Sequence, residues 1–375
     1  MKKAMLLRLR QITEGLGLML LLGLAGVSWG QSSTVCPQGC PYSSIQEAIN
    51  DALPGDTITV GPGAYKEHLE IREKDLQLIG AGAGQVTLEL VAEFVRGGEK
   101  SRAAGLLVAH SVVTLKGFTF KGSSSLWFKN ADVQLRENVF RGEGRGYSSL
   151  YPGIGCVVCI EGGLEFVAED NRWEDYDGSW TVDASLLKEG YALLRLQTDL
   201  SVLRRNSFTR LKGLAIAVMT GQAILEDNRF ERVWRAVQVG RPGRDPQIPE
   251  AFAQLRRNRL QGEGTSSDVI RMGDGVLIYD EAIVEGNSIS EFPGCAVWQS
   301  QPDFERQIRQ IIVTDVLKHF LMVALYGDVR ELPQASVLGK ENSISTSCGS
   351  WCRQTYAQVL CPERRFYPAG FGGGR

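Results

Sequence analysis

One pattern recurs along most of the 375-residue chain and limits the folds available to it. Each copy has a short apolar run, one to three polar residues, an asparagine, one variable residue and an apolar residue. Seven copies are complete, with Asn138, Asn171, Asn206, Asn228, Asn258, Asn287 and Asn342. Two degenerate copies carry Gly117 and Asp315 at the asparagine position, and successive copies lie 21 to 35 residues apart. A recurrence of this length is typical of a solenoid.

The shortest repeats indicate which solenoid. A second strand-like run precedes each asparagine strand, as in "GCVVCI" (155–160) and "GLAIAV" (213–218). Strands this short cannot bury their own faces, but stacked coils can cover one another through parallel strand hydrogen bonds. We therefore predict an all-β fold, a right-handed parallel β-helix. The asparagines are expected at a sharp bend, because asparagine tolerates the left-handed backbone region and its amide can bond to neighbouring coils.

The segment 36–71 predicts how the solenoid begins. Ser44 and Glu47 form a capping box at the start of a helix that Pro54-Gly55 ends. One face of this helix is apolar and carries Ile45, Ala48, Ile49 and Ala52. Such a helix can cover the open strand edges at one end of a β-helix. We therefore expect an N-terminal capping α-helix.

The same region carries a family resemblance. The run "YSSIQEAINDALPGDTITVGPGAYKEHLEI", followed by "LQLIGAG", resembles the amino-terminal signature of the pectin-lyase-like superfamily, and is most similar to that of pectin methylesterases. The asparagine repeats resemble the general β-helix repeat that lyases, hydrolases, esterases and non-enzymes share. The resemblance implies the fold over nearly the whole chain, but it implies an activity over almost none of it.

The first thirty residues are expected to be a signal peptide. A basic head (Lys2, Lys3, Arg8, Arg10) precedes an apolar run of about 12 residues, short of the roughly 20 that a spanning helix needs. We predict a signal peptide (1–30), a cap helix with the first coil (31–82), coils with inserted loops (83–345) and a C-terminal cap or tail (346–375). The protein is then secreted or periplasmic, without a membrane span. A net charge of −2 gives no basis for nucleic-acid binding, and we expect a monomer.

All eight cysteines lie beyond the signal segment, which suits an oxidising compartment. Cys36 and Cys40 flank a tight turn and are expected to form a local disulfide. A bond from Cys348 to Cys352, or from Cys352 to Cys361, can pin a terminal cap. Cys156 and Cys159 lie three apart on a predicted strand, which places the thiols on opposite faces about 10 Å apart. We therefore expect no bond between them.

Two predicted loops contain aromatic and acidic side chains. Tyr147, Tyr151, Tyr176 and Trp180 can stack on sugar rings, or pack the loops against the coil. Among the acidic residues, Asp175 and Asp177 are candidate Ca²⁺ ligands, because Ca²⁺ prefers carboxylate oxygens. A run of acidic residues is also typical of a solvated loop, so both interpretations stay open.

The esterase resemblance implies two catalytic candidates. Asp183 in "TVDASLL" and Arg241 in "VGRPG" follow the family's order, but the residues after each depart from its motifs. Two functions therefore remain. The first is a secreted enzyme acting on polysaccharide, as a lyase, hydrolase or esterase, with Ca²⁺ as its one candidate cofactor. The alternative is a non-catalytic structural, adhesin-like or glycan-binding β-helix.

Overall fold

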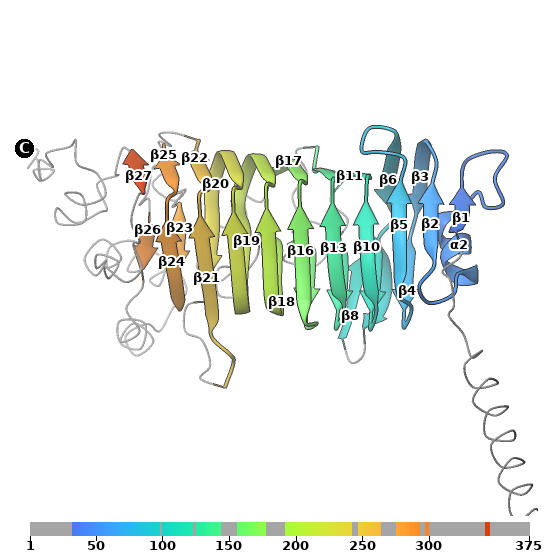
Figure 1. Ribbon diagram of the computed structural model, residues 1–375, viewed down its shortest axis with the longest axis horizontal. Helices are drawn as coiled ribbons and strands as arrows, with labels where there is room; N and C mark the ends of the chain where they lie inside the picture. Colours follow the sequence, from blue (N-terminus) through green and yellow to red (C-terminus); the bar gives the residue numbers. More distant parts are fainter. Residues whose placement is uncertain are drawn as a thin grey trace, which may run out of the picture.

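The computed structural model describes residues 32–97, 100–122, 125–143, 156–177, 192–241, 247–263, 275–292, 297–299 and 342–345. Nearly all of its strands join one 25-stranded sheet, in which every strand pair is parallel and most pairs keep one register throughout. Figure 1 shows these coils stacked along the long axis of the molecule. The predicted fold, an all-β right-handed parallel β-helix, is confirmed. The domain boundaries stay predictions.

Each coil contributes one strand to each of three faces. Face 1 contains β4 (Leu69–Arg72), β9 (Leu106–Ala109), β12 (Leu126–Lys129), β15 (Cys156–Glu161), the start of β18 (Ala192–Arg204), the later part of β19 (Ser207–Glu226), the end of β20 (Arg229–Val239), β23 (Val276–Ile278) and β26 (Val297–Gln299). Face 2 contains β1 (Ser32–Val35), β2 (Thr57–Val60), β5 (Leu76–Gly80), β10 (Val112–Lys116), β13 (Asp132–Arg136), β16 (Glu165–Glu169), the ends of β18 and β19, β21 (Ala251–Arg256) and β24 (Glu281–Glu285).

Face 3 completes the coil and is followed by the longest connections. It contains β3 (Gly63–Glu67), β6 (Val86–Leu90), β11 (Thr119–Lys121), β14 (Val139–Arg141), β17 (Arg172–Asp177), the starts of β19 and β20, β22 (Arg259–Gly262), β25 (Ser288–Ser290) and β27 (Ser343–Ser345). Between β6 and β9, an antiparallel hairpin is formed by β7 (Glu93–Gly97) and β8 (Lys100–Ala104). The insertions between β14 and β15 and between β17 and β18 likewise connect face 3 to face 1.

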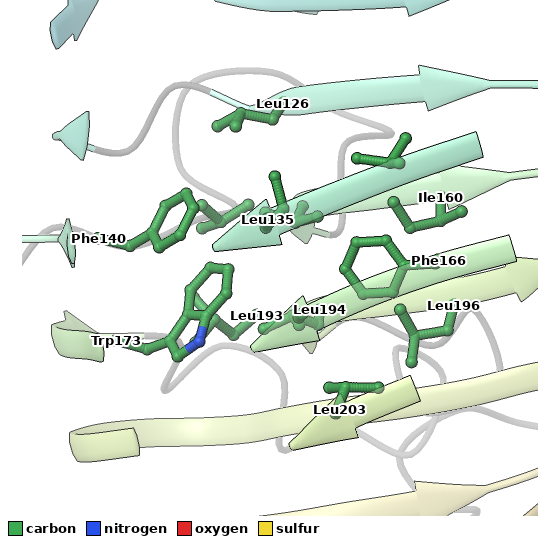
Figure 2. Close-up of a cluster of buried hydrophobic side chains, with 14 of the residues drawn as sticks. Leu126, Leu135, Phe140, Ile160, Phe166, Trp173, Leu193, Leu194, Leu196 and Leu203 are labelled. Carbon is green, nitrogen blue, oxygen red and sulfur yellow. The ribbon is translucent and has the colours of Figure 1, made fainter. Parts of the chain in front are cut away.

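Stacked aromatic rings fill the interior beside face 3. Phe140, Trp173, Phe208 and Phe230 occupy one register position in successive coils. The Phe140 ring lies 3.8 Å from the Trp173 ring at an interplanar angle of 4°, and Phe208 lies 4.6 Å from Phe230. Figure 2 shows the Phe140 and Trp173 side chains together among buried leucines. Each such pair contributes about 0.5–1.5 kcal/mol beyond simple burial, so the stack also reinforces the register.

The repeated asparagines form a buried ladder at the corner between faces 2 and 3. Asn206 shows the pattern, because its Nδ2 donates to Ala168 O (2.8 Å) and to Asn228 Oδ1 (3.0 Å). Its own Oδ1 accepts from Asn171 N (3.1 Å) and Asn171 Nδ2 (3.0 Å). The same contacts run from Asn138 to Asn342. The ladder satisfies backbone groups that the corner would otherwise leave buried and unpaired.

The left-handed backbone position falls one residue before each asparagine from Asn138 to Asn287, and not on the asparagine as we expected. Asp170, Arg205, Asp227 and Arg257 have φ values of 57°, 53°, 55° and 54°. The asparagine side chain must point inward to join the ladder, so the exposed residue before it takes the turn. Arg205 donates to Asp170 and Arg257 to Asp227 through two bonds each, so charge pairs follow the outside of the ladder.

Helix α2 (Ile45–Asp51) covers the amino-terminal end of the coil, beside β1 and β2 (Figure 1). Ser44 accepts a bond from Glu47 N (3.3 Å) at the helix start. The Glu67 carboxylate, at the end of β3, also accepts bonds from Ile45 N and Gln46 N, both at 3.0 Å. A residue from the coil therefore helps to cap the helix and attaches it to the coil.

A disulfide joins Cys36 to Cys40 at the same end, the local pairing expected from the turn between them. None of the helices among the described residues has the length and apolar character needed to cross a membrane.

Replacing one ladder residue should destabilise the protein. In Asn206→Ala, the backbone N–H and the side-chain Nδ2 of Asn171 both lose their acceptor, Asn206 Oδ1. The backbone oxygen of Ala168 loses its donor, Asn206 Nδ2. Buried polar groups without partners cost about 1–3 kcal/mol each, so we expect a loss of about 2–4 kcal/mol. Urea unfolding measures it. Gln222→Ala, at an exposed position of β19, the strand that follows Asn206, is the control. Equal stability in the two variants would mean that the ladder contributes little.

Candidate functional site

The outward-pointing residues of face 1 form a row that is largely buried. Their neighbours along each strand, such as Leu126 and Phe128, lie in the main core, so the row itself points away from the interior. The row, here called the central row, is in register from coil to coil: Glu70, Leu107, Trp127, Cys159, Arg195, Ala217, Gln238 and Leu277. Trp127 is 1% exposed and Gln238 0%, whereas Val112 on the outside of face 2 is 50% exposed. Face 1 is therefore the face whose outer surface is packed.

A repeated bend shapes this surface. In β15, Val157 and Val158 are consecutive and both lie in the main core. The next strands of face 1 repeat this arrangement with Leu193-Leu194, Ala215-Ile216 and Ala236-Val237. Because two neighbours point inward, the residues before and after them both point outward. Each bent strand thus presents two outward residues, three positions apart, to the same part of the outer surface.

This bend overturns our expectation for Cys156 and Cys159, which form a disulfide with a Cα–Cα distance of 5.5 Å. A regular strand would hold their Cα atoms about 10 Å apart. The inward pair Val157-Val158 brings the two cysteines to one face, where they pack against Leu107 and Trp127 in a second hydrophobic cluster. The following bent strands carry no cysteine at these positions, so the bend itself does not require the disulfide.

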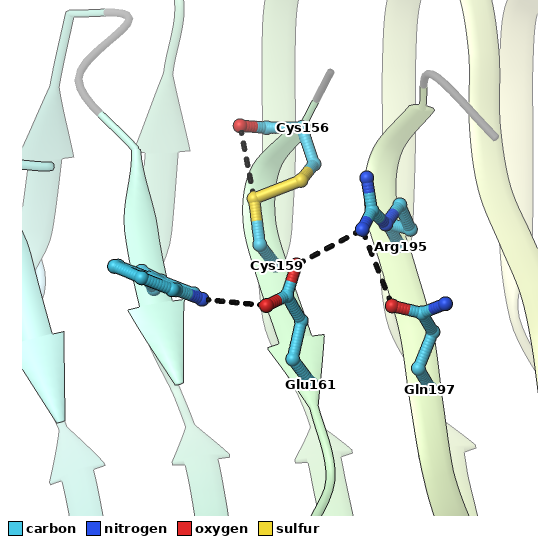
Figure 3. Close-up of a disulfide and its surroundings, with 6 residues drawn as sticks. Cys156, Cys159, Glu161, Arg195 and Gln197 are labelled. Atoms are coloured by element: carbon cyan, nitrogen blue, oxygen red, sulfur yellow. Dashed lines mark hydrogen bonds and ion pairs between the residues drawn. A yellow bond between two sulfur atoms is a disulfide. The ribbon is translucent and has the colours of Figure 1, made fainter. Parts of the chain in front are cut away.

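A buried ion pair lies next to the disulfide. Arg195 Nη2 donates to Glu161 Oε1 at 2.9 Å, and each side chain is only 11% exposed. Trp127 Nε1 donates to the other carboxylate oxygen at 3.2 Å, and Arg195 also donates to Gln197 Oε1 at 3.2 Å. Figure 3 shows the Glu161, Arg195 and Gln197 side chains and the disulfide on two neighbouring strands. Together they form a group of charged and polar side chains on the outward surface of a parallel sheet, which we call the Glu161–Arg195 centre.

Stability alone gives little reason for this arrangement. Removing two charges from water costs several kcal/mol per ion, and apolar side chains of similar volume are often at least as stabilising. A buried ion pair that stability does not account for is a candidate for a role in binding or catalysis. The position is therefore a candidate active site on physical grounds.

The backbone is irregular beside the centre. The register between β18 and β19 shifts on both sides of Gln197. Gly221 follows with φ +73°, and a Cβ there would lie 2.0 Å from Thr198 O, so only glycine fits. Such bulges redirect side chains and are frequent next to active sites. Here the register shifts flank Gln197, the residue whose side chain accepts a hydrogen bond from Arg195.

Two further polar residues lie on face 1 in the coils that follow. Gln238 belongs to the central row and donates to Gly240 O at 3.0 Å. Arg235, at the other outward position of the same bend, is 8% exposed. Arg241, a predicted catalytic residue, comes directly after Gly240 at the end of β20 and is half-buried. It thus lies at the edge of face 1, and its role stays a prediction.

Tyr176, predicted to bind a sugar ring, lies in the main core and is 2% exposed, which corrects that prediction. The segment "RWEDYD" is strand β17 and not a loop. Asp175 takes φ +61°, and this turn lets both Trp173 and Tyr176 point inward. Burial raises the pKa of the Tyr176 hydroxyl well above its usual range. The ring is therefore unavailable for stacking at the surface.

The two predicted Ca²⁺ ligands are paired with cations of the next coil. Arg210 Nη2 donates to Asp175 Oδ2 at 2.9 Å, and Lys212 Nζ lies 3.4 Å from Asp177 Oδ2. The bond from Arg210 lowers the pKa of Asp175. Among the described residues, no three His, Cys, Asp or Glu side chains are grouped so that they could hold a metal. These two aspartates do not fit a Ca²⁺ site.

Other predicted residues lie outside the described residues and stay predictions: Tyr147, Tyr151, Trp180, Asp183, Cys348 and Cys352. The residues of the Glu161–Arg195 centre were not singled out from the sequence. Their signal is a polar side chain inside an otherwise apolar strand, as with Arg195 and Gln197 in "ALLRLQ" and Glu161 at the end of "CVVCIE".

The sequence matches no protein-family model and no curated protein at a significant level. Several solved structures resemble it. The A-module of a mannuronan C-5 epimerase from Azotobacter vinelandii is 13% identical with a TM-score of 0.39, over 67% of this chain and 66% of that one, just under two thirds. Pectin methylesterase PemA from Erwinia chrysanthemi is 9% identical with a TM-score of 0.34, over 71% and 80%. A mannuronic acid specific polysaccharide family 6 lyase from human gut microbiota is 11% identical with a TM-score of 0.29, over 77% and 90%. At these values the likeness concerns the fold alone.

The Asp175–Arg210 pair should make stability depend on pH in acid. The lowered pKa of Asp175 means that its stabilisation is complete above its unfolded value of about 3.9 and is lost as pH falls through the folded value. Asp175→Asn should cost less than about 1 kcal/mol at pH 7, since the pair is exposed. Its stability should also fall less steeply below about pH 4 than that of the wild type. Urea unfolding between pH 2 and 7 tests this, and parallel curves for the two proteins would contradict it.

Ca²⁺ should not stabilise the protein through Asp175. Both oxygens of this carboxylate bond to Arg210, so a cation would have to displace a fixed guanidinium. We expect that any change in Tm on adding Ca²⁺ is the same in the wild type and in Asp175→Asn. Thermal unfolding with Ca²⁺ or EDTA measures it. A Ca²⁺-dependent rise in Tm that disappears in Asp175→Asn would restore the calcium site.

Proposed function

We propose that the protein is secreted and acts on an acidic polysaccharide at the Glu161–Arg195 centre. The observation that carries the proposal is the ion pair between these residues, only 11% exposed, on the outward surface of a long parallel sheet. An arginine guanidinium recognises carboxylates through paired bonds, and uronic acids carry such a carboxylate on every residue. The expected signal peptide and the disulfides support export.

The residues present suit an elimination better than a hydrolysis. Glycoside hydrolysis generally uses two carboxylates on opposite sides of the bond. Glu161 supplies a carboxylate in contact with Arg195. An elimination needs a single base and a cation to neutralise the sugar carboxylate. Glu161 and Arg195 can supply these two roles.

In the proposed step, the sugar carboxylate pairs with Arg195 and takes the place of Glu161. Trp127 Nε1, which bonds to Oε2, keeps the released Glu161 carboxylate in position. Glu161 then removes the proton on the carbon next to the sugar carboxylate. The electron pair of that C–H bond forms a carbon–carbon double bond, the neighbouring glycosidic C–O bond breaks, and the leaving oxygen takes up a proton. Both products are sugar chains, one with an unsaturated end.

A second candidate is a non-catalytic, glycan-binding or structural rod. It is favoured by the charge pairs between successive coils, such as Asp170 with Arg205 and Asp227 with Arg257. If the Glu161–Arg195 pair has the same purpose, it joins two coils and has no reaction to perform.

Incubation of the mature protein with a panel of acidic and neutral polysaccharides tests both candidates. We expect unsaturated uronates, detected by mass spectrometry. Glu161→Gln keeps the shape but removes the base, and should slow product formation by about 10²–10⁴-fold. Arg195→Gln should do the same.

The matched control is Arg204→Gln on the same strand, which pairs with Glu226 on face 2 at 3.1 Å. It should keep full activity. Binding without any product, unchanged by Glu161→Gln, would favour the non-catalytic candidate. Water-added fragments would point to a hydrolase, and methanol release without cleavage to an esterase.

A further inference from the structure

A cavity of 330 Å³ lies between α2 and β4, at the amino-terminal end of face 1. Its lining residues are Gln46, Ile49, Asn50, Glu70, Arg72 and Lys74. The volume lies in the range of small-ligand sites, about 300–1,000 Å³. The lining is polar apart from Ile49, which is a composition that suits a sugar better than an apolar ligand.

The cavity lies on the same face as the Glu161–Arg195 centre. Glu70 is the first residue of the central row, and Arg72 is aligned through Ala109 and Lys129 with Glu161. Three strand steps separate Arg72 from Glu161, which corresponds to about 14 Å at about 4.8 Å per step. Arg72, Lys129 and Glu161 lie at the ends of their strands, outside the packed central row, and each is exposed or partly exposed. An extended polymer that follows these strand ends along the axis of the β-helix can reach both positions.

Gln46 and Lys74 attach α2 to β4. Gln46 Nε2 donates to Glu70 O at 3.1 Å, and Gln46 Oε1 accepts from Glu70 N at 2.7 Å. Lys74 Nζ donates to Ile49 O and Asn50 O, both at 2.9 Å. These bonds hold the cavity walls in place. Arg72, with a side chain 40% exposed, lines the cavity and pairs with Glu70.

We propose that this cavity is a distal subsite for an acidic sugar residue of the polysaccharide bound at Glu161 and Arg195. Arg72 pairs with the sugar carboxylate, as Arg195 does at the centre. Asn50 and Glu70 bond to hydroxyl groups, and Ile49 contacts the apolar edge of the ring. This inference rests on the proposed function, because it concerns the same bound chain.

The test is calorimetric binding of oligouronates of increasing length. The starting protein carries Glu161→Gln, so that the ligands stay intact, and it is compared with the double variant Glu161→Gln, Arg72→Gln. Oligosaccharides long enough to reach the cavity should bind the double variant about tenfold more weakly, as expected for one lost charged hydrogen bond. Short oligosaccharides should bind both proteins equally. Arg72→Lys in the same background should recover part of the affinity.

Arg136→Gln is the matched control, because Arg136 is similarly exposed and pairs with Glu169 on face 2. If the affinity rises with oligosaccharide length by the same factor in all variants, the subsite is overturned but the proposed function stands. Absence of binding at every length, with Arg195 intact, overturns the subsite and the proposed function together. Thermal unfolding of each variant shows that it is folded, so a change in affinity reports on the cavity.

Discussion

Hydrogen bonding between successive coils is the interaction on which the rest of this structure depends. No coil has enough residues to enclose a core, so each takes its stability from the coils on either side. The asparagine ladder fixes how one coil sits on the next, since every amide bonds both to a carbonyl and to another asparagine. That fixed register also aligns residues far apart in sequence. Cys159, Arg195 and Ala217 are neighbours on face 1 only because their coils stack without slipping.

Face 1 shows how a regular scaffold can carry an irregular surface. The inward pairs of the bent strands add to the core, and the positions on either side of them are left facing outward. Most of these positions hold small or apolar side chains, as expected for positions that are buried. The exceptions are Arg195, which pairs with Glu161, and Arg235 and Gln238 two strands further on. The register is also broken beside Gln197. Polar residues, a disulfide and a bulge together distinguish this part of the face from the rest.

The fold could be predicted from the sequence because the repeat is local: an apolar strand, a corner and an asparagine can be recognised within ten residues. The candidate site could not. Glu161 and Arg195 are 34 residues apart, and their contact depends on how the intervening insertion is accommodated. The cysteine pair was misjudged because a regular alternation was assumed where Val157 and Val158 both point inward. Tyr176 was misjudged because its acidic neighbours were taken for a loop, whereas the turn at Asp175 directs them outward and the ring inward.

The shortest coils have a consequence for how such a protein can change. The coil from Gly117 to Asn138 has 21 residues and lies between the amino-terminal cavity and the Glu161–Arg195 centre. Duplicating it would preserve every contact of the ladder and move the two positions apart by one strand spacing, about 4.8 Å. Deleting it would bring them together by the same step. The distance between the cavity and the Glu161–Arg195 centre can therefore change in evolution only by whole coils, while the residues at both positions remain unchanged.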